Sequence, residues 1–248
     1  RNMSKIFFSE MKIADPSYDL NVNNMEYAQM VGKMTLKLNL VLEKEKVDGV
    51  LVYGDTNSTL AGSLAAKKLN LPIFHVEAGL RSYDRKMLEE NNRIITDHLS
   101  SLLFCPTKSA IRNLKDENIS TGISFTGDVM YDSYLKFIST IKNDIKTNIS
   151  SNYILCTLHR RENITSKSKL SSIFRSLDAI NDKIKIIMPL HPHTRKKMKE
   201  FKISTKITLF EPLSYMEMLL LIRNCDLVIT DSGGLQKESF FAKKKSLI

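Results

Sequence analysis

The sequence predicts an α/β protein that carries two parallel β-sheets. Short β-branched and apolar runs alternate with segments that have apolar residues at helical spacing, and this alternation is typical of parallel sheets. A polar stretch without periodicity, Lys142–Ser151, interrupts the series once. We therefore expect two Rossmann-like domains, residues 1–146 and 147–248, whose sheets face a cleft.

The first domain should alternate strands with helices from residue 49 onward. The strands are expected at Gly49–Tyr53, Pro72–Val76, Leu102–Cys105 and Ile123–Thr126, with a further short strand at Asp19–Val22. The helices are expected at Glu26–Glu45, Thr56–Leu69, Leu88–Ser100, Thr107–Lys115 and Val129–Ile141.

The second domain repeats this alternation. Strands are expected at Tyr153–Thr157, Lys185–Met188, Lys206–Phe210 and Leu227–Thr230. Helices are expected at Lys169–Ile180, Pro192–Glu200, Ser214–Arg223 and Ser232–Ala242.

The composition is that of an ordinary globular protein. Of the 248 residues 42% are hydrophobic, and we find neither an apolar run long enough to span a bilayer nor a signal peptide. Cys105, Cys156 and Cys225 fall in apolar runs, so we expect buried thiols in a reducing compartment. The net charge of +10 comes mostly from scattered Lys residues without a basic stripe. We expect a cytoplasmic protein with neither a nucleic-acid nor a membrane partner.

Both ends of the sequence favour a piece of a longer chain. It opens at Arg1 without an initiator Met, inside an amphipathic segment. It stops at Ser246-Leu247-Ile248, where an apolar strand begins.

Charged residues gather where the first strands end. Asp55 follows one predicted strand and Glu77 the next, so both should lie at the carboxyl edge of one sheet, where ligands bind. Either acid alone is more often a helix cap or a loop anchor. Together with Arg81 and Glu89 on adjacent turns, they favour a site for general acid–base chemistry, because carboxylates in one crevice raise each other's pKa.

In the second domain, Ser232, Gly233 and Gly234 follow a strand and open a helix. Glycines let a ligand approach the backbone, and a helix N-terminus offers free N–H groups to a phosphate. Glu238, about one and a half turns on, can accept hydrogen bonds from ribose hydroxyls. The common alternative for such a turn is a plain helix cap.

Two further strand ends carry basic residues. His159 and Arg160 follow the first strand of the second domain, and guanidinium groups match phosphate oxygens. The alternative is a surface ion pair with Glu162. His191 and His193 follow the next strand, but no third ligand lies nearby in sequence, so we expect no metal.

Together these residues resemble the non-hydrolysing UDP-N-acetylglucosamine 2-epimerase family. The pieces that carry the resemblance occur in order across nearly the whole chain: Gly54-Asp55-Thr56, His75-Val76-Glu77-Ala78-Gly79-Leu80-Arg81, Glu89-Glu90 with Asn92-Arg93, Pro106-Thr107, Thr126-Gly127, His159-Arg160-Arg161-Glu162-Asn163 and Thr230-Asp231-Ser232-Gly233-Gly234-Leu235-Gln236-Lys237-Glu238. The resemblance implies a fold like the B-type glycosyltransferases, with UDP in the cleft.

The resemblance also implies a reaction. UDP leaves C1 and a proton leaves C2 of UDP-N-acetylglucosamine, and re-addition gives UDP-N-acetylmannosamine. The implied catalytic set is Asp55, Glu77, Glu89 and His159, and the implied substrate-binding set is Arg81, Arg160, His191, Ser232, Gly233, Gly234 and Glu238. No cofactor is implied, the partner is a UDP-sugar, and we expect a homodimer.

Two alternatives stay open. The same chemistry on a UDP-2,3-diacetamido-2,3-dideoxyglucuronate-type sugar is one, and a nucleotide-sugar-binding fragment without turnover is the other. A retaining glycosyltransferase of the same architecture is disfavoured by the Glu77 and Glu89 pair.

Overall fold

The computed structural model describes Phe8 and residues 10–141 and 152–248. The chain divides into two compact units, one formed by Pro16–Val129 and the other mainly by Met130–Ile248. The predicted boundary between residues 146 and 147 lies outside the described residues. Helix α6 (Val129–Thr140), which the sequence places before that boundary, groups with the unit that follows it.

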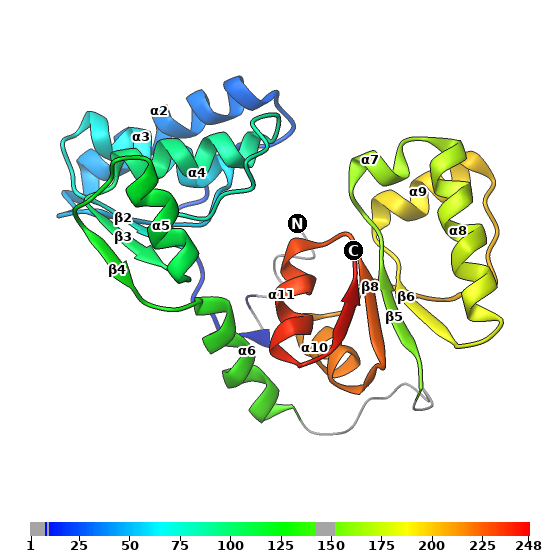
Figure 1. Ribbon diagram of the computed structural model, residues 1–248. Helices are drawn as coiled ribbons and strands as arrows, with labels where there is room; N and C mark the ends of the chain where they lie inside the picture. Colours follow the sequence, from blue (N-terminus) through cyan, green and yellow to red (C-terminus); the bar gives the residue numbers. More distant parts are fainter. Residues whose placement is uncertain (1–7, 9, 142–151) are drawn as a thin grey trace. The chain divides into compact units, whose positions relative to one another are not determined.

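The first unit is built on a four-stranded sheet. All of its strands are parallel and lie in chain order, so each β-α-β step moves one place along the sheet. The strands are β1 (Val50–Tyr53), β2 (Ile73–Val76), β3 (Leu102–Cys105) and β4 (Ile123–Phe125). The helices are α2 (Tyr27–Glu45), α3 (Asn57–Lys68), α4 (Leu88–Leu99) and α5 (Lys108–Asp116), and Figure 1 shows them in blue to green.

Small residues let α3 pack closely in this unit. Ala66 of α3 packs with Val52 of β1 and Ile73 of β2, while Leu60 and Ala61 meet α2 at Val31. α5 packs on β3 through Ala110 and Leu114. Because these contacts bury mainly apolar side chains, they fix the strand ends that follow β1 and β2.

The second unit has a five-stranded parallel sheet in the order β7-β6-β5-β8-β9. Its strands are β5 (Ile154–Thr157), β6 (Ile186–Pro189), β7 (Thr208–Phe210), β8 (Leu227–Thr230) and β9 (Lys245–Leu247). Its helices after α6 are α7 (Arg161–Ile164), α8 (Lys167–Asn181), α9 (Pro192–Phe201), α10 (Tyr215–Asn224) and α11 (Gly233–Phe241).

Both faces of the second sheet are covered (Figure 1). Ile154 and Cys156 of β5 face the cluster that contains Leu170 and Phe174 of α8. Leu155, which lies between them in sequence, joins the cluster with α10 and α11 on the opposite face. This period of two explains why β5 is apolar throughout, as expected for a strand buried on both sides.

The expectation of an α/β fold with two Rossmann-like parallel sheets is confirmed. The other predicted elements are present with ends shifted by one or two residues, and β9 is the strand expected at the C-terminal end. The strand predicted at Asp19–Val22 was wrong, because Asn21 has a left-handed backbone (φ 50°) and its N–H bonds the Asp19 carboxylate. The three thiols are buried and free, as expected.

Candidate functional site

The two acids of the first unit follow neighbouring strands. β1 and β2 pair in register, with Tyr53 opposite Val76. Gly54 has a φ of +63°, and a Cβ at this glycine would lie 3.4 Å from Oε2 of Glu77. The structure therefore places the Glu77 carboxylate over Gly54, directly beside the turn that leads to Asp55.

Glu77 has an unusual backbone. Its φ is +73°, a region that side-chain-bearing residues seldom adopt. The N–H groups of Glu77 and Ala78 both donate to the carbonyl of Phe104 on β3, at 3.1 Å each. Such a conformation costs about 1–3 kcal/mol and is found preferentially at functional sites.

Arg93 of α4 joins two carboxylates. Its guanidinium forms ion pairs with Asp55 and with Glu90, the latter at 2.5 Å. Glu90 is 1% exposed and also accepts hydrogen bonds from Ser82 and from the N–H of Tyr83. Burial favours a raised pKa for Glu90, but these donors and Arg93 together lower it, so Glu90 stays ionised.

The buried side of α4 is polar. Its four buried residues are Glu90, Asn92, Thr96 and Asp97. The Asn92 amide donates to the backbone carbonyl of Asp55 at 2.9 Å and accepts from the Tyr27 hydroxyl at 2.6 Å. Glu89, the predicted catalytic residue of this helix, is exposed on its first turn. One helix therefore presents Glu89 to solvent and holds Asp55 in place.

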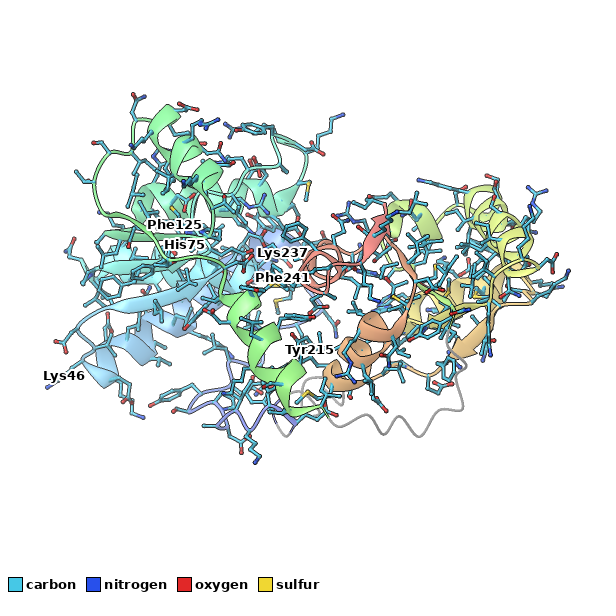
Figure 2. All side chains as sticks on the ribbon, turned by 60° about the horizontal axis from the view of Figure 1, so that its bottom comes forward. Lys46, His75, Phe125, Tyr215, Lys237 and Phe241 are labelled. Carbon is cyan, nitrogen blue, oxygen red and sulfur yellow. The ribbon has the colours of Figure 1, made fainter. Side chains whose placement is uncertain are left out.

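His75 lies inside the first unit, where Figure 2 labels it. Its Nδ1 is 2.7 Å from Asp97 and its Nε2 is 2.8 Å from the carbonyl of Gly54. Asp97 also accepts from the N–H of Gly79 and from Arg81. This network ties the loops after β1 and β2 to α4.

Arg81, which the resemblance offers for substrate binding, is part of this network. Its guanidinium is 1% exposed and is paired with Asp97 at 2.7 Å and with Glu117 at 2.7 Å. Hydrogen bonds and charge from these two carboxylates raise the Arg81 pKa despite the opposing effect of burial, which is the largest contribution. In this arrangement Arg81 supports the loop and offers no guanidinium surface to a ligand.

The carboxyl edge of the second sheet has a different geometry. From β5 the chain moves outward to β6 and β7 and then crosses back to β8 on the other side of β5. Open α/β sheets bind ligands at such a reversal. Thr157 of β5 lies opposite Thr230 of β8, and their hydroxyls are 2.6 Å apart. A pocket of about 270 Å³ opens at this edge, with a lining that includes His159, His191, Met218, Ser232 and Leu235.

His159 is held by Asp231. The Nδ1 of His159 is 3.1 Å from the Asp231 carboxylate, which also accepts the N–H groups of His159 and Arg160 and the Asn163 amide. Burial favours a raised pKa for Asp231, but these donors lower it below its usual range. Asp231 is therefore a carboxylate that accepts hydrogen bonds from three residues of the turn that carries His159.

Two more histidines adjoin His159. The ring of His191 is 5.7 Å from that of His159 and 5.4 Å from that of His193. Burial and the neighbouring imidazoles lower the pKa of His191, so it stays neutral near pH 7. Arg160 is exposed, 3.5 Å from Glu162. Both this ion pair and a free guanidinium for an anion are compatible with that exposure.

The glycine-led turn opens α11 as predicted. Ser232 is its N-cap and accepts the N–H of Leu235. Among the described residues, a Cβ on Gly233 would meet nothing within 4 Å, and one on Gly234 only Ser232 and Met130 at the edge of contact. Packing within the described chain therefore does not require glycine at either position.

Glu238 lies one and a half turns further along α11. It is 9% exposed, and burial raises its pKa to about 7 although the Tyr215 hydroxyl hydrogen-bonds it. Tyr215 comes from α10 and is labelled in Figure 2 together with Phe241 of α11. Tyr215 therefore orients the carboxylate that the sequence assigns to ribose.

The described residues form no cluster of three or more His, Cys, Asp or Glu side chains that could hold a metal ion. None of the described helices has the length and apolarity needed to cross a bilayer.

The sequence interpretation gave no role to Glu90 and Asp231, although both stand in its motifs, and it did not single out Asp97 or Tyr215. One signal was present: Glu90, Arg93 and Asp97 recur at helical spacing, which places their charges on one face of α4. The roles of Asp231 and Tyr215 depend on partners far away in sequence, and no local pattern announces them.

Comparisons with known proteins agree with this fold. The chain is 49% identical to a UDP-N-acetylglucosamine 2-epimerase homolog of Methanococcus maripaludis, over 97% of this chain and 70% of that one. It is 45% identical to the UDP-2,3-diacetamido-2,3-dideoxy-D-glucuronate 2-epimerase of Pseudomonas aeruginosa, over 98% and 70%. The crystal structure of the Methanocaldococcus jannaschii UDP-GlcNAc 2-epimerase with UDP-GlcNAc and UDP has a TM-score of 0.88 at 41% identity, covering 99% of this chain and 72% of that one.

The chain has two Rossmann-like units. In the first unit carboxylates follow the strand ends, and in the second unit histidines and a glycine-led helix follow them. Together with the relatives, these features define an enzyme of the sugar-nucleotide epimerase class. The family can be stated as well. The chain belongs to the UDP-N-acetylglucosamine 2-epimerase family, whose model matches residues 1–248.

Proposed function

We propose that this protein epimerises UDP-N-acetylglucosamine at C2 to UDP-N-acetylmannosamine, reversibly, by elimination and re-addition of UDP. The observation that carries the proposal is the strained, left-handed Glu77 beside Gly54 at the end of β2. Such strain is found preferentially at functional sites, and it is explained here if the Glu77 carboxylate takes part in the chemistry.

In this proposal the first unit performs the proton transfers. Its three carboxylates, Asp55, Glu77 and Glu89, divide two tasks between them. One task is to transfer the C2 proton, and the other is to stabilise the positive charge that develops at C1. Arg93 and Asn92 hold Asp55 at its side chain and backbone, respectively. Isotope exchange at C2 distinguishes the roles within this carboxylate set.

The second unit binds the nucleotide. Ser232, Gly233 and Gly234 present the N-terminus of α11 to the diphosphate, and Glu238 accepts from the ribose. His159 faces the departing diphosphate, with His191 and Arg160 adding hydrogen bonds and charge. Arg81 contributes indirectly, through the loop that it holds.

The test is isotope exchange with a panel of UDP-sugars in D₂O, followed by NMR. We expect C2 deuteration and the 2-epimer with UDP-N-acetylglucosamine, and about 10²–10⁴-fold slower exchange in Glu77→Gln. Exchange at the wild-type rate in Glu77→Gln would make Glu77 structural. Tight UDP binding without exchange of any sugar would favour the binding fragment over the enzyme.

The second candidate is the same reaction on a UDP-2,3-diacetamido-2,3-dideoxyglucuronate-type sugar. It is favoured by the 45% identity to the Pseudomonas aeruginosa protein that carries this activity in its name. The same panel decides between the two sugars through their ratio of kcat/KM.

A further inference from the structure

The carboxylate of Asp231 accepts hydrogen bonds from three residues of the turn that follows β5. Its two oxygens receive the N–H of His159 at 3.1 Å, the N–H of Arg160 at 2.9 Å and the Asn163 amide at 3.0 Å. They also lie 3.1 Å from Nδ1 of the His159 ring. A carboxylate has only acceptor sites, so Nδ1 must carry a hydrogen to complete this set.

This bond decides what the other ring nitrogen of His159 can do. With hydrogen on Nδ1, the neutral ring has its lone pair on Nε2, and the protonated ring has a donor there. His159 is about two-fifths exposed and lines the pocket at the β5 and β8 ends. Nε2 is therefore the atom at which this ring can give or take a proton.

The neighbouring His191 has the opposite neutral tautomer. Its Nδ1 accepts the backbone N–H of His193 at 3.2 Å, where it caps α9. When neutral, His191 therefore has its hydrogen on Nε2, and this remaining nitrogen can only donate. Two adjacent imidazoles, 5.7 Å apart, thus differ in tautomer, and only His159 is arranged to exchange a proton.

We propose that Asp231 is a positioning residue that holds His159 as the proton carrier for the leaving diphosphate. When the C1–O bond breaks, its electron pair passes to the phosphate oxygen, which takes the proton from Nε2. On re-addition the oxygen returns that proton to Nε2 as the C1–O bond forms, while the C2 proton is handled separately by a carboxylate of the first unit. The inference rests on the proposed function.

The first test reads the tautomer directly, in the wild-type protein. Long-range ¹H–¹⁵N NMR of the histidine rings, with His159→Gln as the assignment variant, distinguishes the two neutral tautomers. We expect His159 with hydrogen on Nδ1 and His191 with hydrogen on Nε2. A wild-type His159 with hydrogen on Nε2 alone would overturn the proposal, and this readout does not depend on any activity.

The second test uses Asp231→Asn. The new side-chain amide can donate to Nδ1 of His159 and so reverse the tautomer of the ring, as the same Asp-to-Asn substitution does in the Asp–His pairs of serine hydrolases. We expect kcat to fall about 10²–10⁴-fold with KM changed less than about threefold. Asp178→Asn is the matched control, since Asp178 in the same unit also accepts a hydroxyl and a backbone N–H.

A double-mutant cycle separates positioning from general support. If Asp231 acts through His159, His159→Gln with Asp231→Asn should be no slower than His159→Gln alone. Losses that multiply would show that Asp231 acts independently of the ring, and the proposal would fail. If the wild-type protein turns over no UDP-sugar, the proposed function fails, while the tautomer measurement still decides the Asp231–His159 relationship.

Discussion

The guanidinium of Arg93 on α4 pairs with the carboxylate of Asp55, which lies just beyond the end of β1. The same guanidinium lies 2.5 Å from buried Glu90. Glu90 in turn holds the loop after β2 through Ser82 and Tyr83. One side chain therefore couples the position of a candidate catalytic acid to the anchor of a neighbouring loop.

Replacement of Arg93 should disturb both the position of Asp55 and the anchoring of the loop after β2. In Arg93→Lys a single ammonium cannot bridge two carboxylates as a guanidinium does. We expect turnover to fall at least about tenfold and the free energy of unfolding to fall by about 1–3 kcal/mol, because Glu90 loses a charged donor while buried. Steady-state kinetics and urea unfolding measure the two effects. Arg112→Lys, at an exposed position of α5, is the control, and equal losses in both variants would contradict the bridging role.

The sequence was sufficient for nearly all of the fold. Apolar runs and helix caps such as Thr56 and Ser214 are local signals, and they located the strands and helices to within one or two residues. The strand predicted at Asp19–Val22 failed for a local reason too, since the Asp19 side chain competes for the backbone N–H of Asn21.

Only part of the candidate site could be predicted from the sequence. Motifs singled out Asp55, Glu77, His159 and Ser232 as candidates, because each comes one or two residues after the end of a strand. The supporting pairs were not readable, because they join residues far apart in sequence: Arg93 with Asp55, and Asp231 with His159. Arg81 shows that a motif can also leave a residue's role undecided. Its motif is the same whether the guanidinium contacts a ligand or is buried against Asp97.

The strained backbone at Glu77 predicts a trade-off between stability and activity. Glu77→Gly should relieve the positive φ and raise the free energy of unfolding by about 1 kcal/mol while abolishing turnover. Glu77→Gln keeps the strain and should leave stability near that of the wild type.

Lys46 supplies the matched control for this prediction. It caps α2 with a φ of +50° and is exposed, as labelled in Figure 2. Lys46→Gly should gain similar stability by thermal unfolding without loss of activity. A Glu77→Gly variant less stable than Glu77→Gln would show that the left-handed conformation carries no strain at this site.

The open space over Gly234 predicts that a methyl group there harms binding more than folding. In Gly234→Ala the added Cβ meets only Ser232 and Met130, at 3.9 and 4.0 Å. Because alanine favours helices, the free energy of unfolding should be unchanged or up to about 1 kcal/mol higher. UDP affinity, measured by calorimetry, should fall at least about tenfold if phosphate approaches this backbone. Unchanged affinity would place the diphosphate elsewhere.

Glu238 predicts a pH dependence of stability with a defined sign. Burial raises its pKa from an ordinary value near 4.5 to about 7, so the folded state holds this proton more tightly than the unfolded state. The contribution of Glu238 to stability is therefore full below about pH 4.5 and is lost as the pH rises through about 7. Above that pH both states are ionised and the loss is constant, at no more than about 3.5 kcal/mol.

Glu238→Gln removes the titration while keeping the shape of the side chain. The difference in unfolding free energy between Glu238→Gln and the wild type should grow in favour of the variant from about pH 4.5 to about pH 7 and then level off. Urea unfolding across this range measures it, with Glu200→Gln on the exposed side of α9 as the control. A difference that does not change between pH 5 and 8 would mean that Glu238 ionises normally in the folded protein. In that case the hydrogen bond from the Tyr215 hydroxyl offsets the burial of the carboxylate.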